Sequence, residues 1–386
     1  MIRRTMVAST LALAATLAAG GVAAQNVKLP PSLTMTAYDT GTSGFNIAVA
    51  IGKVMKEKHQ SDLRVLPAGN DIARLSPLKA GRAQASAMGI GGYFASEGIF
   101  EFATKDWGPQ PLQLLLSAVS CNGITLNVAK DTGVKEFKDL KGKRIGIVVG
   151  SPALNQNAFA IIAFGGLTKD DVKLVEFSSF GAMWKGMMNN EVDAAIASTI
   201  TGQVRELEAS PRGVVMPQTP ASDKAGWERM RKLGPYFYPH KTTCGAGGLS
   251  ATNALELPSY PYPIFMAYAS QPEDLIYNIA KAMIVDYPDY KSGAPGADGL
   301  EVKRQILDWV LPYHPGTVKA LKEAGAWTDA AQKHNDMLLK RQATLATAWA
   351  DFNKANPPAD KDAFAKAWMA ARKAALVKAG LDPVFE

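Results

Sequence analysis

Short runs of apolar and often β-branched residues alternate along the chain with segments in which apolar residues recur every three or four positions. The first pattern is typical of buried strands and the second of amphipathic helices. The predicted strands are Leu33–Ala37, Leu63–Leu66, Ala85–Met88, Leu112–Ala118, Ile124–Val128, Arg144–Val149, Lys173–Phe177, Ala194–Ala197 and Val214–Met216. Their alternation with helices predicts an α/β protein with largely parallel sheets.

The helical pattern is clearest at Phe45–Lys58, Pro152–Phe164 and Phe180–Asn189. Beyond about residue 257 the pattern becomes mainly helical. Two amphipathic helices are predicted near the end of the chain, at Gln332–Phe352 and Asp362–Ala379.

The N-terminal segment has the pattern of a secretory signal peptide. Arg3 and Arg4 precede an uncharged apolar run over residues 6–19, and small residues then lead to a cleavage site near Ala24. An uncleaved membrane anchor is the alternative, because the uncharged stretch is almost long enough to span a bilayer. We expect residues 1–24 to be removed and the mature protein to lie outside the cytoplasm.

Composition and charge narrow the class of partner. The chain has 386 residues, 47% of them hydrophobic, and loss of the two leader arginines lowers its formal net charge from +7 to +5. The lysines are scattered and form no basic stripe interleaved with aromatic residues, so nucleic acid is not expected as a partner. A modest positive field favours an anionic solute.

Small polar or glycine-containing turns follow several predicted strands and lead into helices. These turns lie at Thr40–Phe45, Gly89–Tyr93, Gly150–Asn155 and Ser198–Thr201. In open α/β sheets ligands bind beyond the carboxyl ends of the strands, where helix N-termini offer free N–H groups to a carboxylate. Ordinary helix capping is the alternative for any single turn.

The sequence offers little that points to catalysis. The histidines at positions 59, 240, 314 and 334 lie at no metal-ligand spacing from one another, from cysteine or from acidic residues. The phosphate-binding and dinucleotide-binding glycine patterns are incomplete. We therefore expect neither enzyme activity nor a metal or cofactor. Cys121 and Cys244 permit one disulfide in an oxidising compartment, with two buried thiols as the alternative.

Several motifs together resemble one family of receptors. Asp139–Ile145, followed by Gly150 and Ser151, resembles the second lobe of type II periplasmic binding proteins. Further motifs are similar to the TAXI family, the solute receptors of one branch of tripartite ATP-independent periplasmic (TRAP) transporters. These motifs are Gly41–Phe45, Asn70–Leu75, Lys79–Gly81, Met187–Ala194, Pro235–Pro239, Gln271–Tyr277 and His314–Gly316, within residues 34–327.

The resemblance implies a two-lobed periplasmic binding protein type II fold with hinge strands. The implied divisions are lobe 1 over 25–126 and 246–326, lobe 2 over 127–245, and a helical C-terminal extension over 327–386. The hinge crossings are expected near Thr125–Ala129 and Gly245–Asn253. Because Cys121 and Cys244 would each lie beside a crossing, the resemblance favours a bridge between them.

The expected ligand contacts follow from the turns and from the resemblance. They are Thr40, Gly41, Thr42, Ser43, Phe45, Arg74, Gly91, Tyr93, Gly150, Ser151, Asn155, Trp184, Thr199 and Thr201. The guanidinium of Arg74 can clamp a carboxylate, and a salt bridge with Asp71, one helical turn earlier, is the alternative. Tyr93 and Trp184 are expected either in a roomy aromatic pocket or in the core.

The resemblance further implies a monomeric periplasmic receptor that captures a small organic anion, expected to be a carboxylate. It would deliver this ligand to the membrane-embedded subunits of a TRAP transporter. A sensor that signals to a membrane kinase and a periplasmic enzyme that acts on a small organic acid are the alternatives.

Overall fold

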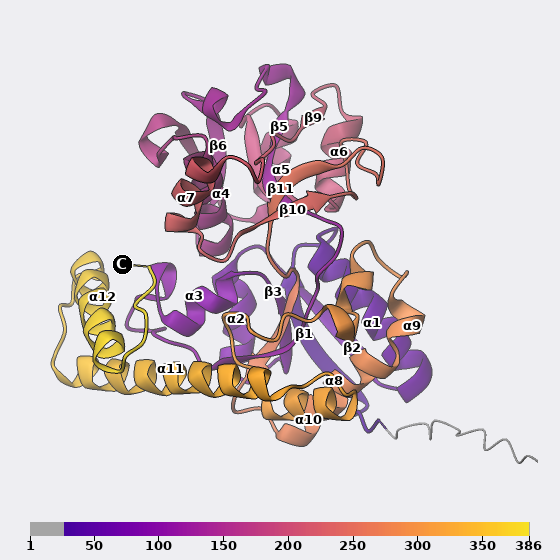
Figure 1. The fold of residues 1–386 in the computed structure, drawn as a ribbon, viewed down its shortest axis with the longest axis vertical. Coiled ribbons are helices and arrows are strands. Elements are labelled where there is room, and N and C mark those ends of the chain that lie inside the picture. The colour runs from indigo at the N-terminus through magenta and orange to yellow at the C-terminus, as the bar shows by residue number, and fades with distance from the viewer. Residues whose placement is uncertain (1–26, 386) are drawn as a thin grey trace, which may run out of the picture.

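The computed structural model describes residues 27–385 and arranges them in two lobes, one above the other in Figure 1. Each lobe contains a five-stranded sheet with helices packed around it. The expected two-lobed α/β fold is therefore confirmed. The signal peptide predicted over residues 1–24 lies outside the described residues.

The sheet of lobe 1 has the strand order β2-β1-β3-β12-β4. Its strands are Ser32–Tyr38 (β1), Asp62–Ala68 (β2), Ala85–Met88 (β3), Leu112–Ser117 (β4) and Ile264–Tyr268 (β12). The helices of this lobe are Ser43–His59 (α1), Asp71–Lys79 (α2), Gly91–Glu97 (α3), Glu273–Val285 (α8), Tyr287–Tyr290 (α9) and Pro315–Glu323 (α10). Because α3, α8 and α10 pack against β4, this strand is buried throughout although it lies at an edge of the sheet.

The sheet of lobe 2 has the order β7-β6-β8-β5-β9. Its strands are Ile124–Ala129 (β5), Arg144–Val148 (β6), Lys173–Phe177 (β7), Ala194–Ser198 (β8) and Val214–Val215 (β9). Its helices are Pro152–Phe164 (α4), Phe180–Met188 (α5), Gly202–Ala209 (α6) and Lys224–Leu233 (α7). An antiparallel pair, Tyr238–Thr242 (β10) and Leu255–Ser259 (β11), lies at the base of the lobe.

The prediction of largely parallel sheets is wrong in detail, because both sheets are mixed. In lobe 1, β12 runs antiparallel to β3 and β4, and in lobe 2, β5 runs antiparallel to β8 and β9. The remaining pairs are parallel. The strands β5 and β12 are the first strands after the two crossings between the lobes, and each enters its new sheet against the direction of its neighbours.

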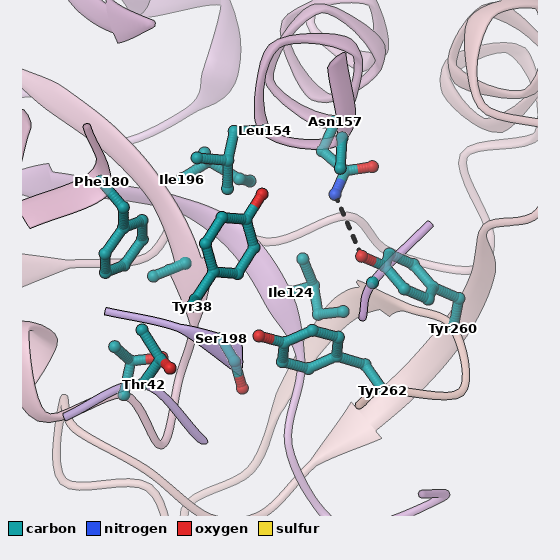
Figure 2. Close-up of a pocket in the computed structure, with 14 residues that line it drawn as sticks. Tyr38, Thr42, Ile124, Leu154, Asn157, Phe180, Ile196, Ser198, Tyr260 and Tyr262 are labelled. Carbon is teal, nitrogen blue, oxygen red and sulfur yellow. Dashed lines mark hydrogen bonds between the residues drawn. The ribbon is translucent and has the colours of Figure 1, made fainter. Parts of the chain in front are cut away.

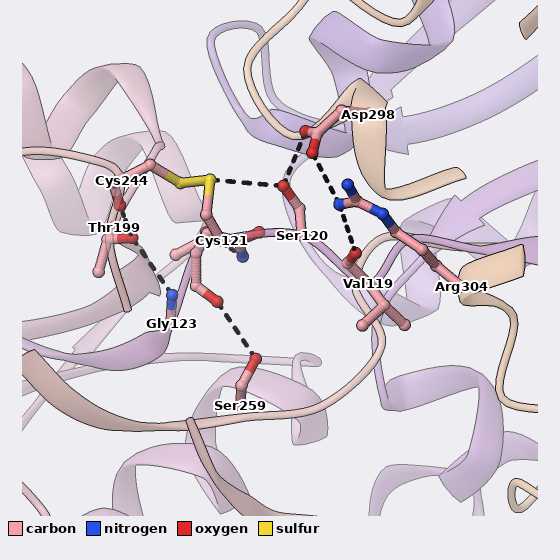
Figure 3. Close-up of a disulfide and its surroundings, with 11 residues drawn as sticks. Val119, Ser120, Cys121, Gly123, Thr199, Cys244, Ser259, Asp298 and Arg304 are labelled. Carbon is pink, nitrogen blue, oxygen red and sulfur yellow. Dashed lines mark hydrogen bonds and ion pairs between the residues drawn. A yellow bond between two sulfur atoms is a disulfide. The ribbon is translucent and has the colours of Figure 1, made fainter. Parts of the chain in front are cut away.

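The two crossings lie close together between the lobes. One is residues 118–123, between β4 and β5, and the other is residues 260–263, between β11 and β12. A disulfide joins Cys121, in the first crossing, to Cys244, in the loop between β10 and β11 (Figure 3). The hydroxyl of Thr199 donates a hydrogen bond to the carbonyl of Cys244 and ties this loop to the end of β8. The division of the chain into lobes by residue number stays a prediction.

The C-terminal extension consists of two long helices, Asp329–Lys354 (α11) and Lys361–Lys378 (α12). Figure 1 shows α11 running along lobe 1 and α12 folding back beside α3. The buried carboxylate of Glu97, at the end of α3, binds the guanidinium groups of Arg341 on α11 and Arg372 on α12. The extension is therefore an integral part of lobe 1.

Short 3₁₀ helices complete the fold at Phe100–Phe102, Lys130–Thr132, Phe137–Leu140, Lys169–Asp171, Ala297–Leu300 and Val302–Arg304. Within residues 27–385, the helices are too short or too polar to cross a membrane. In the same part of the chain, no cluster of three or more His, Cys, Asp or Glu side chains is placed to hold a metal ion.

Candidate functional site: a closed cleft between the lobes

A small cavity lies between the two lobes, where strand ends and helix starts from both sheets meet. Lobe 1 contributes residues from the end of β1, the turns after β1 and β3, and the second crossing. Lobe 2 contributes the start of β5, the first turns of α4 and α5, and the end of β8. The lining residues are Tyr38, Thr42, Gly89, Tyr260, Tyr262, Ile124, Ala153, Leu154, Asn157, Phe180, Ile196, Ala197, Ser198 and Thr201 (Figure 2).

Local sequence explains why these turns face the cleft. Gly150 adopts a positive φ of 74°, which lets the chain turn sharply from β6 into α4. Pro152 then occupies the first helical position, where its missing N–H costs no hydrogen bond. At the opposite side, Thr42 caps α1 by accepting a hydrogen bond from the N–H of Phe45. Both helices therefore begin at the cleft.

The cavity is small and uncharged. Its volume is about 30 Å³, which is room for two or three water molecules at roughly 10–15 Å³ each. Among the described residues that line it, none carries a charged side chain. The lobes are therefore closed on each other, and an organic solute can enter only if they separate.

Aromatic hydroxyls provide much of the polar surface. Asn157, on α4, donates a hydrogen bond of 3.3 Å to the hydroxyl of Tyr260 and accepts one of 2.8 Å from the hydroxyl of Tyr236. Burial raises the pKa of Tyr38, Tyr260 and Tyr262, so all three hydroxyls stay protonated at neutral pH. The site thus offers neutral hydroxyl and amide groups on an otherwise apolar wall.

A buried ion pair lies beside the cavity. Asp71 and Arg74, one turn apart on α2, form a salt bridge, and both side chains are completely buried. The carboxylate of Asp71 also accepts hydrogen bonds from the Tyr38 hydroxyl at 2.7 Å and from the N–H of Ala153 at 2.8 Å. The hydroxyl of Ser151 donates a longer bond of 3.3 Å to the same carboxylate. Tyr38 and Ala153 line the cavity, so the carboxylate lies directly behind its wall.

The guanidinium of Arg74 is held from several sides within lobe 1. Its Nη1 donates to the carbonyl of Ala87 at 3.0 Å, and its carbon lies 3.3 Å from the centre of the Tyr38 ring. Burial lowers the pKa of Arg74, but the negative charge of Asp71 and the neighbouring tyrosine oxygens outweigh this effect and raise the pKa overall. Arg74 is therefore a cation in the closed cleft.

Further hydrogen bonds join the lobes around the cavity. The N–H of Gly181, in the first turn of α5, donates to Asp39 at 2.8 Å. The N–H of Phe180 donates to the carbonyl of Gly69 at 2.9 Å, and that of Gly202 donates to the carbonyl of Gly41 at 3.1 Å. The side chain of Gln203 reaches the carbonyl of residue 40. These bonds break when the lobes open, so they favour closure.

The structure divides the expected contact residues into three groups. Thr42 and Thr201 line the cavity. Thr40, Gly41, Gly150, Ser151 and Arg74 take part in contacts between the lobes or lie directly behind them. Ser43, Phe45, Gly91, Tyr93, Asn155, Trp184 and Thr199 lie outside the cavity lining.

The residues of the third group have evident structural surroundings. The side chain of Asn155 binds the backbone N–H and carbonyl of Val148 and so fastens α4 to β6. Tyr93 packs in lobe 1 against Phe94 and Phe385. Trp184 is buried against Phe180. For Arg74, the alternative of a salt bridge with Asp71 is the arrangement observed.

The aromatic residues that line the cavity are not among the expected ligand contacts. Tyr38 directly follows the predicted strand Leu33–Ala37, so the argument for the turns that follow strands applies to its side chain as well. Tyr260 and Tyr262 lie in a proline-rich segment, where alternate positions point the same way in extended chain. Leu154 and Asn157 are three residues apart and therefore share one face of α4. These patterns are present in the sequence, but they identify cavity-lining residues only once the relative positions of the two lobes are known.

Comparison with known structures finds two-lobed binding proteins at low identity. An ancestral arginine-binding protein bound to arginine is 17% identical and matches 69% of this chain and 97% of its own, with a TM-score of 0.42. The alkanesulfonate-binding protein SsuA from Xanthomonas axonopodis pv. citri, bound to MOPS, is 16% identical over 88% of this chain and 98% of its own, with a TM-score of 0.44. A periplasmic binding protein from Brucella ovis with glutathione bound is 11% identical over 90% and 88%, with a TM-score of 0.44.

At the level of sequence, residues 35–325 match the NMT1-like family. The matched region includes both sheets apart from the first three residues of β1, both crossings and every residue that lines the cavity. It ends before α11 and α12, so the C-terminal extension lies outside the matched region. The chain belongs to the NMT1-like family.

Proposed function

We propose that this protein is a periplasmic solute receptor, which binds a small organic molecule between its lobes and presents it to a membrane transporter. The observation that carries the proposal is a cavity between the lobes whose wall is built from both of them. Ligands of such a site are surrounded only when the lobes close. Two short crossings, 118–123 and 260–263, allow the lobes to move as units.

The degree of lobe closure must differ between the ligand-free and ligand-bound forms if the protein is to work as a receptor. A ligand shifts the open and closed populations only by its difference in affinity for the two forms. The closed cavity of about 30 Å³ is smaller than an organic solute. We infer that the bound state closes less completely than the ligand-free state, with the solute held between Tyr38, Leu154 and Tyr260.

The proposed ligand is a small organic anion with a carboxylate group. The formal charge of +5 without the leader, the two helix N-termini of α4 and α5, and the cationic Arg74 support this class. The motifs that resemble the TAXI family support delivery to a TRAP transporter. The proposed role is binding without chemical conversion, which agrees with an uncharged cavity wall in the described part of the chain.

Thermal unfolding of the mature protein against a panel of carboxylates, amino acids, sulfonates and neutral aromatic compounds tests the proposal. A ligand that binds the folded state at about 100 times its Kd adds roughly 2.7 kcal/mol of stability. The proposal predicts stabilisation by one chemical class, with the compound recovered unchanged. Mass spectrometry of molecules released from the purified protein shows whether the cleft was already occupied. An empty protein that no compound stabilises would contradict the receptor function.

A further inference from the structure

The side chain of Asp71 makes a contact between the lobes that needs a functional explanation. It belongs to lobe 1, yet it accepts hydrogen bonds from Ser151 and from the N–H of Ala153 in lobe 2. Within its own lobe it accepts from the Tyr38 hydroxyl and pairs with Arg74. One carboxylate thus collects donors from both sides of the cleft.

The position has the properties of a binding site for a carboxylate. Helix α4 has thirteen residues, and its first free N–H groups and positive dipole end favour an anion. Within the described chain, Ser151 makes no side-chain capping bond to its own helix. The carboxylate of Asp71 takes that role from the opposite lobe. The helix is therefore capped only while the lobes are closed.

A second observation comes from Arg74. Its side chain is fully buried, and its Nε has no hydrogen-bond partner among the described residues. A buried guanidinium donor without a partner costs stability. The Asp71–Arg74 cluster therefore holds an N–H donor, at Nε of Arg74, to which the Asp71 carboxylate does not bind.

Gly91 makes room for the carboxylate in its present position. A β-carbon at residue 91 would lie 2.7 to 2.9 Å from the three terminal atoms of the Asp71 side chain. Any larger residue there would displace that side chain. The space beside α3 is thus fitted to a carboxylate group next to Arg74.

The carboxylate position adjoins the cavity. Tyr38 and Ala153 each line the cavity, and each donates a hydrogen bond to Asp71. Arg74 and the N-terminus of α4 both lie beside the cavity, and Asp71 already occupies them, so a solute carboxylate could bind there only in place of Asp71.

We propose that Asp71 is a built-in substitute for the ligand's carboxylate. In the ligand-free form it fills the anion position and holds the lobes closed, and a carboxylate ligand takes its place at Arg74 and the start of α4. The identity of the displacing ligand rests on the proposed receptor function, whereas the presence of a carboxylate site at this position does not. A ligand without a carboxylate leaves Asp71 where it is.

Chemical rescue tests the site without knowledge of the natural ligand. Asp71→Ala removes the carboxylate and leaves Arg74 and the N-terminus of α4 unpaired. Sodium acetate should then raise the unfolding temperature of this variant in a saturable manner, while acetamide and sodium chloride at equal ionic strength should not. Wild-type protein should show no saturable response, because its own carboxylate fills the site.

The matched control is Asp39→Ala. Asp39 also meets a helix N-terminus of lobe 2, through Gly181, but it is partly exposed and, among residues 27–385, forms no ion pair with a buried arginine. Acetate should therefore give this variant no saturable stabilisation. Equal responses of the two variants, or no response of Asp71→Ala to acetate, would overturn the proposed site. If Asp71→Ala does not fold, Asp71→Gly is refolded in the presence of acetate instead. Failure of acetate to restore folding would also overturn the proposed site.

Displacement by ligand is tested with Asp71→Asn, which keeps the shape of the side chain without its charge. A carboxylate that stabilises the wild type should bind this variant at least tenfold more tightly, because it no longer competes with an internal anion. Unchanged or weaker binding would overturn displacement and leave the receptor function intact. If no compound binds either protein, the receptor function fails, and the acetate experiment still decides whether the carboxylate site exists.

Discussion

Replacement of Glu97 by alanine should release the C-terminal extension from lobe 1. This carboxylate, 2% exposed, accepts hydrogen bonds of 2.6 and 2.8 Å from Arg341 and also pairs with Arg372. The two guanidinium groups further bind the carbonyls of Asp382 and Pro383. In Glu97→Ala both arginines lose their counter-charge in a largely buried position.

The expected magnitude follows from the burial of the three charges. Removal of one partner from a buried ion pair costs about 3–5 kcal/mol, because an uncompensated charge remains. Detachment of α11 and α12 exposes the arginines to water and relieves that cost. We therefore expect the extension to open before the rest of lobe 1 unfolds, with an opening equilibrium about a hundredfold to several thousandfold more favourable.

Hydrogen–deuterium exchange of the backbone amides is the appropriate assay, because it reports opening of one segment while the rest stays folded. In Glu97→Ala, amide exchange in α12 should accelerate about a hundredfold to several thousandfold, whereas exchange in the lobe 2 sheet should not change. Asp351→Asn is the control. Asp351 pairs with Lys354 on the surface of α11, where both side chains are more than two-thirds exposed, and such pairs contribute about 0–1 kcal/mol.

A triple variant separates unpaired charge from lost packing. When Glu97, Arg341 and Arg372 are all replaced by methionine, no buried charge remains, and such replacements of buried ion pairs are neutral or stabilising in known cases. Protection of α12 should then return to the wild-type level. If the triple variant opens as readily as Glu97→Ala, or if Glu97→Ala exchanges like the wild type, the reasoning from buried charge is refuted.

Three further predictions concern the hinge, pH and the cavity wall. Replacement of both Cys121 and Cys244 by serine removes a cross-link between residues that are 123 positions apart. The free energy of unfolding should then fall by about 4–5 kcal/mol according to the chain-entropy relation. An unchanged urea midpoint would contradict this. Burial lowers the pKa of His314 below the ordinary 6.5, and its Nδ1 accepts a hydrogen bond from the N–H of Gly316. The unfolded chain therefore takes up this proton at a higher pH than the folded protein, so the stability contributed by neutral His314 is complete above about pH 6.5 and falls as the pH decreases toward the folded pKa. In His314→Gln, the free energy of unfolding measured with urea should change less between pH 7.5 and 5.5 than it does in the wild type. An unchanged pH dependence would count against this assignment. Tyr260→Phe removes the hydroxyl that accepts a hydrogen bond from Asn157. The free energy of unfolding, measured with urea, should fall by about 1 kcal/mol. An unchanged value would indicate that Asn157 finds another partner.

Much of the fold follows from local sequence patterns. Two predicted strands, Ala85–Met88 and Lys173–Phe177, have the boundaries that the structure shows. The last two helices differ from their predicted limits by only a few residues at each end. Uninterrupted apolar runs and long amphipathic stretches are the signals that tertiary packing seldom overrides.

The missed strand β12 illustrates the limit of such patterns. Its five residues, Ile264–Tyr268, are all apolar and lie in a region whose other signals are helical. A short apolar run fits a buried strand and a buried helix equally well. Its role is fixed only by pairing with β3 and β4, which are more than 140 positions earlier in the chain.

The site was predictable as a region but not as a set of contacts. The turns after β1, β3, β6 and β8 do meet at the cleft, as strand ends in open sheets imply. The salt bridge between Arg74 and Asp71 lies within α2 and was open to prediction from their spacing of one helical turn. The hydrogen bond that Asp71 accepts from the N–H of Ala153, at the start of α4, depends instead on the closed arrangement of the lobes. Sequence patterns within one lobe carry no information about that arrangement.

A crystal structure of the protein with the compound selected by the unfolding screen decides whether this cleft is the receptor site. We expect density for the unchanged ligand between the lobes, in contact with Tyr38 of lobe 1 and Leu154 of lobe 2. We also expect a wider cavity than in the ligand-free protein. Ligand density outside the cleft, or a chemically converted compound within it, would contradict the assignment of this cleft as the receptor site.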